Sequence, residues 1–233
     1  MRRPALLGLF LSLIAGSALA QTPSPEVSHT LLGAGLRTRP DYDGARKQVV
    51  DVVPVVRYYG KTLFARTTQG ILEGGARAEL APGLAAGVQL AYEGAGKDVA
   101  AGASVGAHLE WDTKLGPAPI NVLARLRQNL DADRGAQADL RLTAGVYQSG
   151  PLQAGVFTQA TWASSKAIRA YYEVPGSGLL YVSAGALASY DLSCQWVLVG
   201  SIEGRRLQGD ATDSPLMEKR SAWYASAGLA YRF

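Results

Sequence analysis

The stretch QADLRLTAGVY at residues 137–147 alternates between polar and apolar side chains over most of its length. Its apolar positions are Ala138, Leu140, Leu142, Ala144 and Val146. Side chains of a β-strand project alternately to the two faces of a sheet, so the stretch predicts a strand with one apolar and one polar face. A helical stripe would instead recur every three or four residues, and no long segment of the chain shows that period.

The same alternation recurs along the chain after residue 20 and predicts an all-β protein. Twelve segments follow it, at 28–37, 49–58, 62–68, 71–80, 84–93, 99–112, 120–130, 137–147, 152–162, 178–190, 195–207 and 221–233. Only Gln69 and Gly70 separate the third segment from the fourth. We therefore expect an antiparallel up-and-down β-barrel of twelve strands, with ten or fourteen as the alternatives.

The connections between the segments alternate between short and long. Short connections rich in turn-forming residues follow the even-numbered segments, at 59–61, 81–83, 115–119, 149–151 and 191–194. Longer polar connections follow most odd-numbered segments, at 38–48, 131–136, 163–177 and 208–220. Tight turns at one end and long loops at the other are typical of bacterial outer-membrane barrels, whose turns are periplasmic and whose loops lie outside.

Three features indicate that the apolar faces contact lipid and do not form a packed core. Segments of about ten residues match the roughly 9–11 residues of a tilted membrane-spanning strand. The apolar faces are rich in Ala, Leu and Val and nearly free of Phe. Aromatic residues lie at segment ends, where amphipathic rings prefer the membrane interface: Tyr58, Tyr59, Trp111, Tyr147, Trp162, Tyr190 and Trp196. The barrel is therefore expected to be transmembrane.

The polar faces of the strands carry charges of both signs. They are Glu73, Arg77, Glu79, Arg125, Arg127, Asp139, Arg141, Glu203 and Arg205. Mixed signs close together predict ion pairs and hydrogen bonds inside a narrow lumen. About eight strands leave room only for side chains and 16–18 leave an aqueous channel, so twelve strands leave both an open and a plugged lumen possible.

The first 20 residues have the organisation of a cleaved secretory signal peptide. Arg2 and Arg3 precede the apolar run 5–14, and Ala18 and Ala20 form an A-x-A pattern before Gln21. The alternative, an uncleaved anchor helix, needs roughly 20 apolar residues. Cleavage would lower the formal charge from +4 to +2 and leave residues 21–233 as one barrel domain. No Lys/Arg cluster indicates nucleic-acid binding.

The residues offer little for catalysis or for a cofactor. Ser104, His108 and Asp112 share one face of a segment, but their spacing of roughly 13 Å far exceeds hydrogen-bond reach. The chain has two histidines and one cysteine, too few for a zinc site of three histidines or clustered cysteines. No phosphate-binding glycine motif occurs. We expect no enzymatic activity, no metal and no cofactor.

Several stretches resemble the MipA/OmpV family of outer-membrane proteins. The first loop holds a P-x-Y-x-G motif at Pro40, Tyr42 and Gly44. The last long loop contains a G-D-A-x-D-S-P block formed by Gly209, Asp210, Ala211, Asp213, Ser214 and Pro215. Ala170–Val174 and the closing segment Ala227–Phe233 are also similar to the family. The likeness covers essentially the whole chain after the signal peptide.

The resemblance implies a non-enzymatic outer-membrane barrel in contact with outer-membrane lipid and lipopolysaccharide. The family's namesake is a scaffold that joins a lytic murein transglycosylase to a bifunctional penicillin-binding protein. Leu229, Tyr231 and Phe233 alternate on one face of the last segment, and a terminal strand that ends in Phe resembles the signal read by the barrel-assembly machinery. A passive pore for small solutes and an external adhesin or receptor are the alternative functions.

The two loop motifs have structural readings of their own. Asp210, Asp213, Ser214 and Pro215 are turn and cap formers whose side chains bond nearby backbone N–H groups. The alternative is a Ca²⁺ ion, or a cation that bridges lipopolysaccharide, held by the two aspartates. Pro40, Tyr42 and Gly44 are expected to fold the first loop inward or down and not to bind a ligand.

Overall fold

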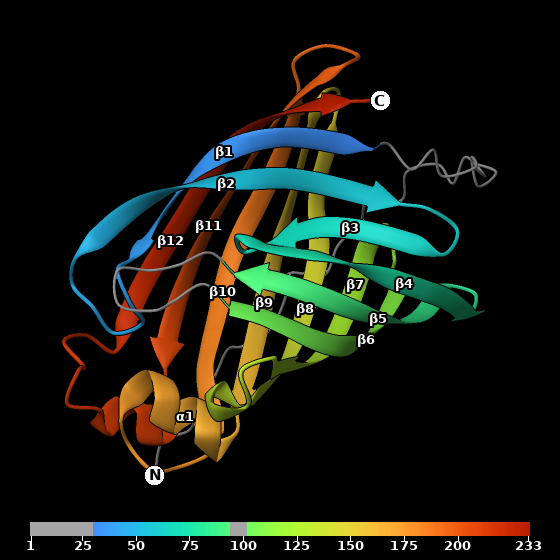
Figure 1. Ribbon diagram of the computed structural model, residues 1–233. Coiled ribbons are helices and arrows are strands. Elements are labelled where there is room, and N and C mark those ends of the chain that lie inside the picture. Colours follow the sequence, from blue (N-terminus) through green and yellow to red (C-terminus); the bar gives the residue numbers. More distant parts are fainter. Residues whose placement is uncertain (1–29, 94–101) are drawn as a thin grey trace, which may run out of the picture.

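A computed structural model describes residues 30–93 and 102–233 as one closed barrel of antiparallel strands (Figure 1). Each strand pairs with its sequence neighbours, and β1 pairs with β12 to close the ring. The strands are β1 (Leu31–Pro40), β2 (Gln48–Tyr59), β3 (Leu63–Thr68), β4 (Ile71–Ala81), β5 (Leu84–Glu93), β6 (Gly102–Leu115), β7 (Ala118–Asn129), β8 (Ala136–Ser149), β9 (Leu152–Ala163), β10 (Gly178–Asp191), β11 (Trp196–Leu207) and β12 (Ser221–Arg232).

The twelve-strand antiparallel barrel expected from the alternation is confirmed. The clearest difference lies in the first strand, which was expected at 28–37 and runs from Leu31 to Pro40 because Thr38–Pro40 pair with Gln48–Val50 of β2. Pro40 therefore ends a strand and does not belong to the loop. The expected signal peptide at 1–20, residues 28–29 and residues 99–101 lie outside the described part of the chain.

The apolar faces point away from the barrel axis and the polar faces point into the lumen. On β5, Leu90 is 62% exposed whereas its neighbour Gln89 is 2% exposed. On β8, Leu140 and Leu142 are exposed whereas Asp139 is buried. The polar and apolar faces are thus placed the opposite way from those of a soluble protein. Polar side chains can bond to one another inside the barrel, and apolar side chains contact lipid outside. No helix within the described residues is long and apolar enough to cross a membrane.

The wall is irregular at β2 and β3. β2 pairs with β1 from Gln48 to Arg57, but its only described partners on β3 are those of Arg57, Tyr58 and Tyr59. β3 has six residues, and a two-residue turn at Gln69 and Gly70 leads back into β4. Both turn residues have positive φ, 53° and 82°, which is typical of a tight hairpin turn.

The long connections form a cap at one end of the barrel. They contain η1 (Ala132–Arg134), α1 (Ser165–Tyr172) and η2 (Gly209–Asp213), and α1 contacts both short helices. Ala167, Ile168 and Tyr172 of α1 pack with Leu180 and Ala211 in a small apolar core. We call this the long-loop end and the opposite end the short-turn end. In Figure 1, α1 and the C-terminus lie at opposite ends.

Candidate functional site

A continuous network of ion pairs fills the lumen along strands β3 to β9. Glu73 of β4 accepts hydrogen bonds from Arg66 Nε at 2.9 Å and from Arg125 Nη1 at 2.5 Å. Asp139 of β8 lies 3.3 Å from Arg125 Nη2 and 3.0 Å from Arg127 Nη2. Each buried carboxylate therefore faces two guanidinium groups, which is how charge is tolerated away from water.

Neutral side chains complete this network, which we call the ion-pair belt. Thr161 donates its hydroxyl to Asp139 at 2.7 Å, and Asn121 donates to Glu110 at 2.9 Å. Arg66 also reaches Glu110 at 3.2 Å. Gln89 of β5 donates to Glu73 at 3.5 Å, so the belt links seven neighbouring strands.

The structure places the charges expected in the lumen in three different settings. Glu73, Arg125, Arg127 and Asp139 belong to the belt, and Arg77 lies at its margin, 3.9 Å from Glu110. Glu79 is exposed at the end of β4, where it accepts a hydrogen bond from the backbone N–H of Gly83. Arg141, Glu203 and Arg205 line a cavity that lies beside the belt.

Sequence reasoning missed the group that organises the long-loop end, the carboxylate of Asp43. Tyr224 donates to it at 2.5 Å and Tyr172 at 3.3 Å, and Arg205 Nη1 lies 3.3 Å away. Asp43 belongs to the loop after β1, so these contacts draw that loop into the mouth of the barrel. The sequence did predict that this loop folds inward or down. It could not show which residues Asp43 contacts, because they come from distant parts of the chain.

The β3–β4 turn also enters the lumen. Arg37 Nη1 of β1 donates to the carbonyl oxygen of Gln69 at 2.5 Å, and Gln69 Nε2 donates to Glu203 of β11 at 2.8 Å. The turn therefore leaves the line of the wall and reaches across to strands that are not its neighbours in the sheet. It obstructs the lumen beside the ion-pair belt.

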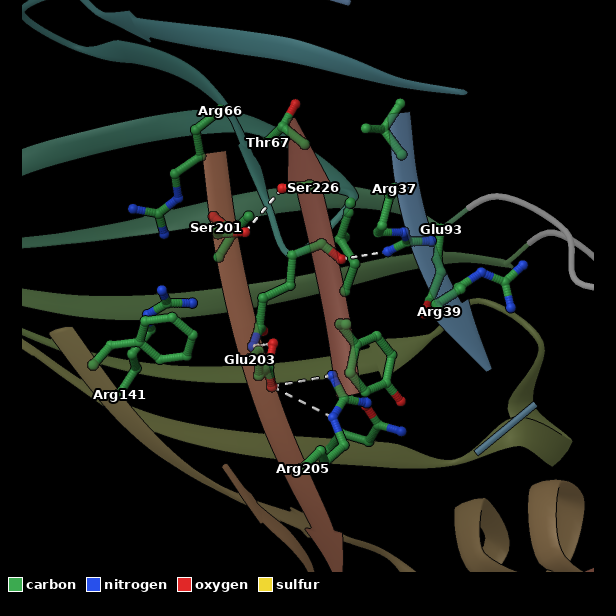
Figure 2. Close-up of a pocket in the computed structure, with 18 of the residues that line it drawn as sticks. Arg37, Arg39, Arg66, Thr67, Glu93, Arg141, Ser201, Glu203, Arg205 and Ser226 are labelled. Atoms are coloured by element: carbon green, nitrogen blue, oxygen red, sulfur yellow. Dashed lines mark hydrogen bonds and ion pairs between the residues drawn. The ribbon is translucent and has the colours of Figure 1, made fainter. Parts of the chain in front are cut away.

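A cavity of about 710 Å³ remains between the belt, the turn and the cap. Figure 2 shows Arg37, Arg39, Arg66, Arg141 and Arg205 arranged around one space, with Glu203 beside Arg205. Ser201 and Ser226 also face this space and share a hydrogen bond of 2.8 Å. Among the described residues, eight arginines and five carboxylates line the cavity, so arginines predominate in its lining.

Two aromatic rings, those of Tyr59 and His108, lie inside the barrel. Tyr59 was expected at the lipid interface but lines the cavity, where Arg77 lies 5.0 Å from its ring centroid. Its position directly after Tyr58 on the same strand explains this, since adjacent side chains point to opposite faces. His108 is buried with its ring edge-on to Phe64 at 4.9 Å, a packing contact in the lumen.

The loop motifs lie in the cap. Asp210 accepts the backbone N–H of Ser177 at 3.2 Å, and the hydroxyl of Ser214 accepts that of Leu216 at 3.1 Å. Gly44 has a φ of 105° and accepts hydrogen bonds from two backbone N–H groups of the last loop. The remaining motif residues lie in the same two loops: Tyr42, Gly209, Asp213 and Pro215. Within the described ranges, no cluster of three or more His, Cys, Asp or Glu side chains suits a metal ion.

The expected assembly residues form an aromatic edge at the short-turn end. Tyr231 packs edge-on against Trp196 at 5.3 Å and against Phe233 at 5.0 Å. Leu229 and Phe233 are exposed on the outer surface. These side chains therefore face lipid and not the lumen.

A closed antiparallel barrel with an apolar exterior and a charged lumen defines the class of outer-membrane β-barrel proteins. The model of one family, described as "MltA-interacting protein MipA", matches residues 32–233, so the chain belongs to the MipA family. The resemblance drawn from the loop motifs and the closing strand is thereby confirmed.

Several solved outer-membrane structures are similar in fold at low identity. The beta domain of the Bordetella autotransporter BrkA is 16% identical with a TM-score of 0.46, covering 88% of this chain and 100% of that chain. An anion-selective porin from Comamonas acidovorans is 12% identical with a TM-score of 0.42, covering 78% of this chain; the chain spans 60% of the porin's length. The outer membrane protease OmpT from Escherichia coli is 12% identical with a TM-score of 0.32, covering 88% of this chain and 95% of that chain. No curated protein has a matching sequence.

Proposed function

We propose that this chain is a non-enzymatic barrel of the outer membrane that serves as a scaffold for enzymes that remodel murein. The family description names an interaction with MltA, and this supports a lytic transglycosylase as the first partner. A bifunctional penicillin-binding protein, joined to the transglycosylase through the barrel, is the second.

The observation that carries the proposal is the obstructed lumen. The ion-pair belt occupies one side, and Gln69 of the β3–β4 turn bridges Arg37 and Glu203 on the other. Asp43 holds the first loop against Arg205 and Tyr224 at the long-loop end. A barrel filled in this way favours a structural role over free diffusion of solutes.

The proposal includes an orientation. Residues 1–20 direct export and are cleaved, and the edge formed by Leu229, Tyr231 and Phe233 is read by the barrel-assembly machinery. The short-turn end then faces the periplasm, where murein lies, and the long-loop end faces lipopolysaccharide. Two exposed leucines at the short-turn end, Leu115 and Leu192, offer apolar surface for docking.

The test is capture of a purified MltA-type lytic transglycosylase by the immobilised, detergent-solubilised barrel. We expect saturable binding that the double variant Leu115→Asp/Leu192→Asp weakens at least tenfold. The matched control is Leu216→Asp, which changes an exposed leucine at the opposite end. Retained heat-modifiable migration in gels would show that the variants are folded. Equal binding by all three proteins, or none by the parent, would contradict the scaffold.

Planar-bilayer recording separates the scaffold from the alternative of a solute pore. The obstructed lumen leads us to expect no steady single-channel conductance from the parent protein. Stable, anion-favouring steps would instead assign the arginine-lined cavity to solute passage and remove the argument from obstruction.

A further inference from the structure

The edge of β2 faces an opening in the wall. Residues 48–56 of β2 pair with β1 and, within the described strands, with nothing on β3. Pro54 lies in this stretch, and proline has no N–H to donate, so it is confined to strand positions without a ladder bond. Val52 beside it is 76% exposed on the outer surface. Each strand of the barrel thus pairs with both neighbours, but the wall is laterally open along residues 48–56, the part of β2 nearer the long-loop end.

The cavity reaches this opening from inside. Its lining includes Val53–Arg57 on β2 and Arg66–Ile71 on the β3–β4 hairpin, which are the two borders of the gap. Figure 1 shows β2 continuing beyond the end of β3. At about 710 Å³, the cavity falls within the roughly 300–1,000 Å³ of typical small-molecule sites.

The lining is divided into an apolar part and a cationic part. Val53, Val55, Leu187 and Val199 line the cavity nearer the short-turn end, where Val55 and Val199 pack against a buried apolar cluster. Arg37, Arg39 and Arg205, which Figure 2 labels, lie toward the long-loop half of their strands, whereas Arg57 lies beyond Val55 toward the short-turn end of β2. A molecule that matches both parts carries a negative head and an apolar chain.

Most of these arginines already face a carboxylate. Arg39 lies 2.5 Å and Arg37 3.4 Å from Asp51, and Arg205 lies between Asp43 and Glu203. Arg141 differs from them. Its guanidinium lies 3.8 Å over the ring of Phe157, and its Nη1 is buried without a hydrogen-bond partner among the described residues. In the part of the chain that the structure describes, no carboxylate lies within ion-pair distance of this half-buried cation to offset the desolvation of its buried Nη1.

We propose that the cavity binds an anionic single-chain lipid, which reaches it from the membrane through the opening between β2 and the β3–β4 hairpin. The carboxylate or phosphate of the lipid pairs with Arg141, and its chain lies along Val53, Val55 and Val199. The guanidinium fork can donate two parallel hydrogen bonds to either head group. This inference is independent of the scaffold proposal.

The binding test uses palmitate, with native mass spectrometry of the barrel released from detergent. We expect one palmitate per barrel, and at least tenfold weaker binding of hexadecanol, which has the same chain and no charge. Lysophosphatidic acid separates the two head groups, and acetate and inorganic phosphate test the heads without a chain. Binding of the heads alone with equal affinity would overturn a lipid site in favour of a simple anion site.

Variants test the anchor. Arg141→Gln should weaken palmitate binding about tenfold or more, because charged hydrogen bonds are the strongest in such sites. Arg141→Lys keeps the charge and should recover part of the affinity. Arg220→Gln, which removes an exposed loop arginine, is the matched control and should bind as the parent does. Equal binding by all four proteins would overturn the role of Arg141.

A palmitate with a photoreactive group near its chain end tests the path. We expect cross-links to peptides that contain Val53–Arg57 or Arg66–Ile71, and excess unlabelled palmitate should suppress them. Labelling spread evenly over the outer surface would indicate only annular lipid and overturn the proposal. A stable dimer cross-linked through residues 48–56 and unaffected by palmitate would assign the open edge of β2 to a second copy, and would equally overturn it.

Discussion

The two sides of the barrel present the same kind of surface to lipid but are filled differently inside. Along β3 to β9, lumen-facing Glu73 and Thr161 are 0% exposed and held by ion pairs and hydrogen bonds. Along β10 to β12, β1 and β2, Ser201 also faces the lumen and yet is exposed to the cavity. The alternating pattern is common to both sides, so the difference comes from which side chains fill the inner face.

A paired belt and a cavity therefore share one lumen, and the cavity also reaches Arg141 and Thr143 of β8. Long charged side chains pair across strands and exclude water where Arg66, Arg125 and Arg127 meet Glu73 and Asp139. Beside the cavity, the inner positions of β1 and β12 include Gly35 and Gly228, which have no side chain to fill it. The cavity therefore follows from residue size, and the belt follows from the cost of unpaired charge.

The largest expected effect breaks the belt at its centre. Glu73→Ala leaves Arg66 and Arg125 buried without one of their carboxylates, and should lower the free energy of unfolding by about 3–5 kcal/mol. Glu79→Ala, on the same strand but exposed, should change it by less than about 0.5 kcal/mol. Guanidinium unfolding in lipid vesicles measures both. Similar losses would mean that the belt does not stabilise the barrel.

The next test concerns the surface that the two sides share. Leu142→Arg on β8 and Ile202→Arg on β11 place a charge against the bilayer midplane, and each should cost about 2–4 kcal/mol. Thr143→Arg, which points into the cavity, should be nearly tolerated. Vesicle unfolding or the yield of folded protein reports the cost. A large loss at Thr143 equal to that at Leu142 would contradict the assignment of faces.

The fold could be read from the sequence because its signal is local. Alternation depends only on adjacent residues, and the polar turns mark where each strand ends, so all twelve strands were found. α1 was missed inside a connection expected to be a loop, although its signals were present: Ser164 caps it by accepting from Ala167 N–H, and Ala167, Ile168 and Tyr171 follow helical spacing. A helix of eight residues is easily hidden in a polar connection.

The site was less accessible to sequence reasoning because it depends on register. The residue types of the belt were visible, but which arginine meets which carboxylate follows from how seven strands are staggered. The same holds for Gln69, whose partners Arg37 and Glu203 lie on β1 and β11. The shortness of the third strand was apparent, yet the opening beside β2 appears only when the pairing of each residue is known.

A third prediction compares the space inside the two sides. Thr161→Leu enlarges a fully buried side chain and removes the hydroxyl that donates a hydrogen bond to Asp139. It should lower the free energy of unfolding by about 1–3 kcal/mol. Ser201→Leu adds more bulk beside the cavity and removes an exposed hydrogen bond to Ser226, yet should cost less than about 1 kcal/mol because the cavity can take the larger side chain. Equal costs in vesicle unfolding would show that the cavity side is as tightly packed as the belt side.

The smallest effect concerns the cap above the cavity, outside the membrane-spanning strands. Burial, and then the carboxylate of Asp43, raise the pKa of Tyr172 well above its usual value of about 10. The hydroxyl donates to Asp43, so Tyr172→Phe should lower the free energy of unfolding at pH 8 by about 0.5–1.5 kcal/mol.

Above about pH 10 the unfolded tyrosine ionises while the folded one keeps its proton, so the parent loses this advantage as pH rises. The parent and variant unfolding curves should therefore converge between pH 10 and 11, because the other tyrosines are common to both. A difference that stays constant across this range would show that Tyr172 is not held in its neutral form by the cap.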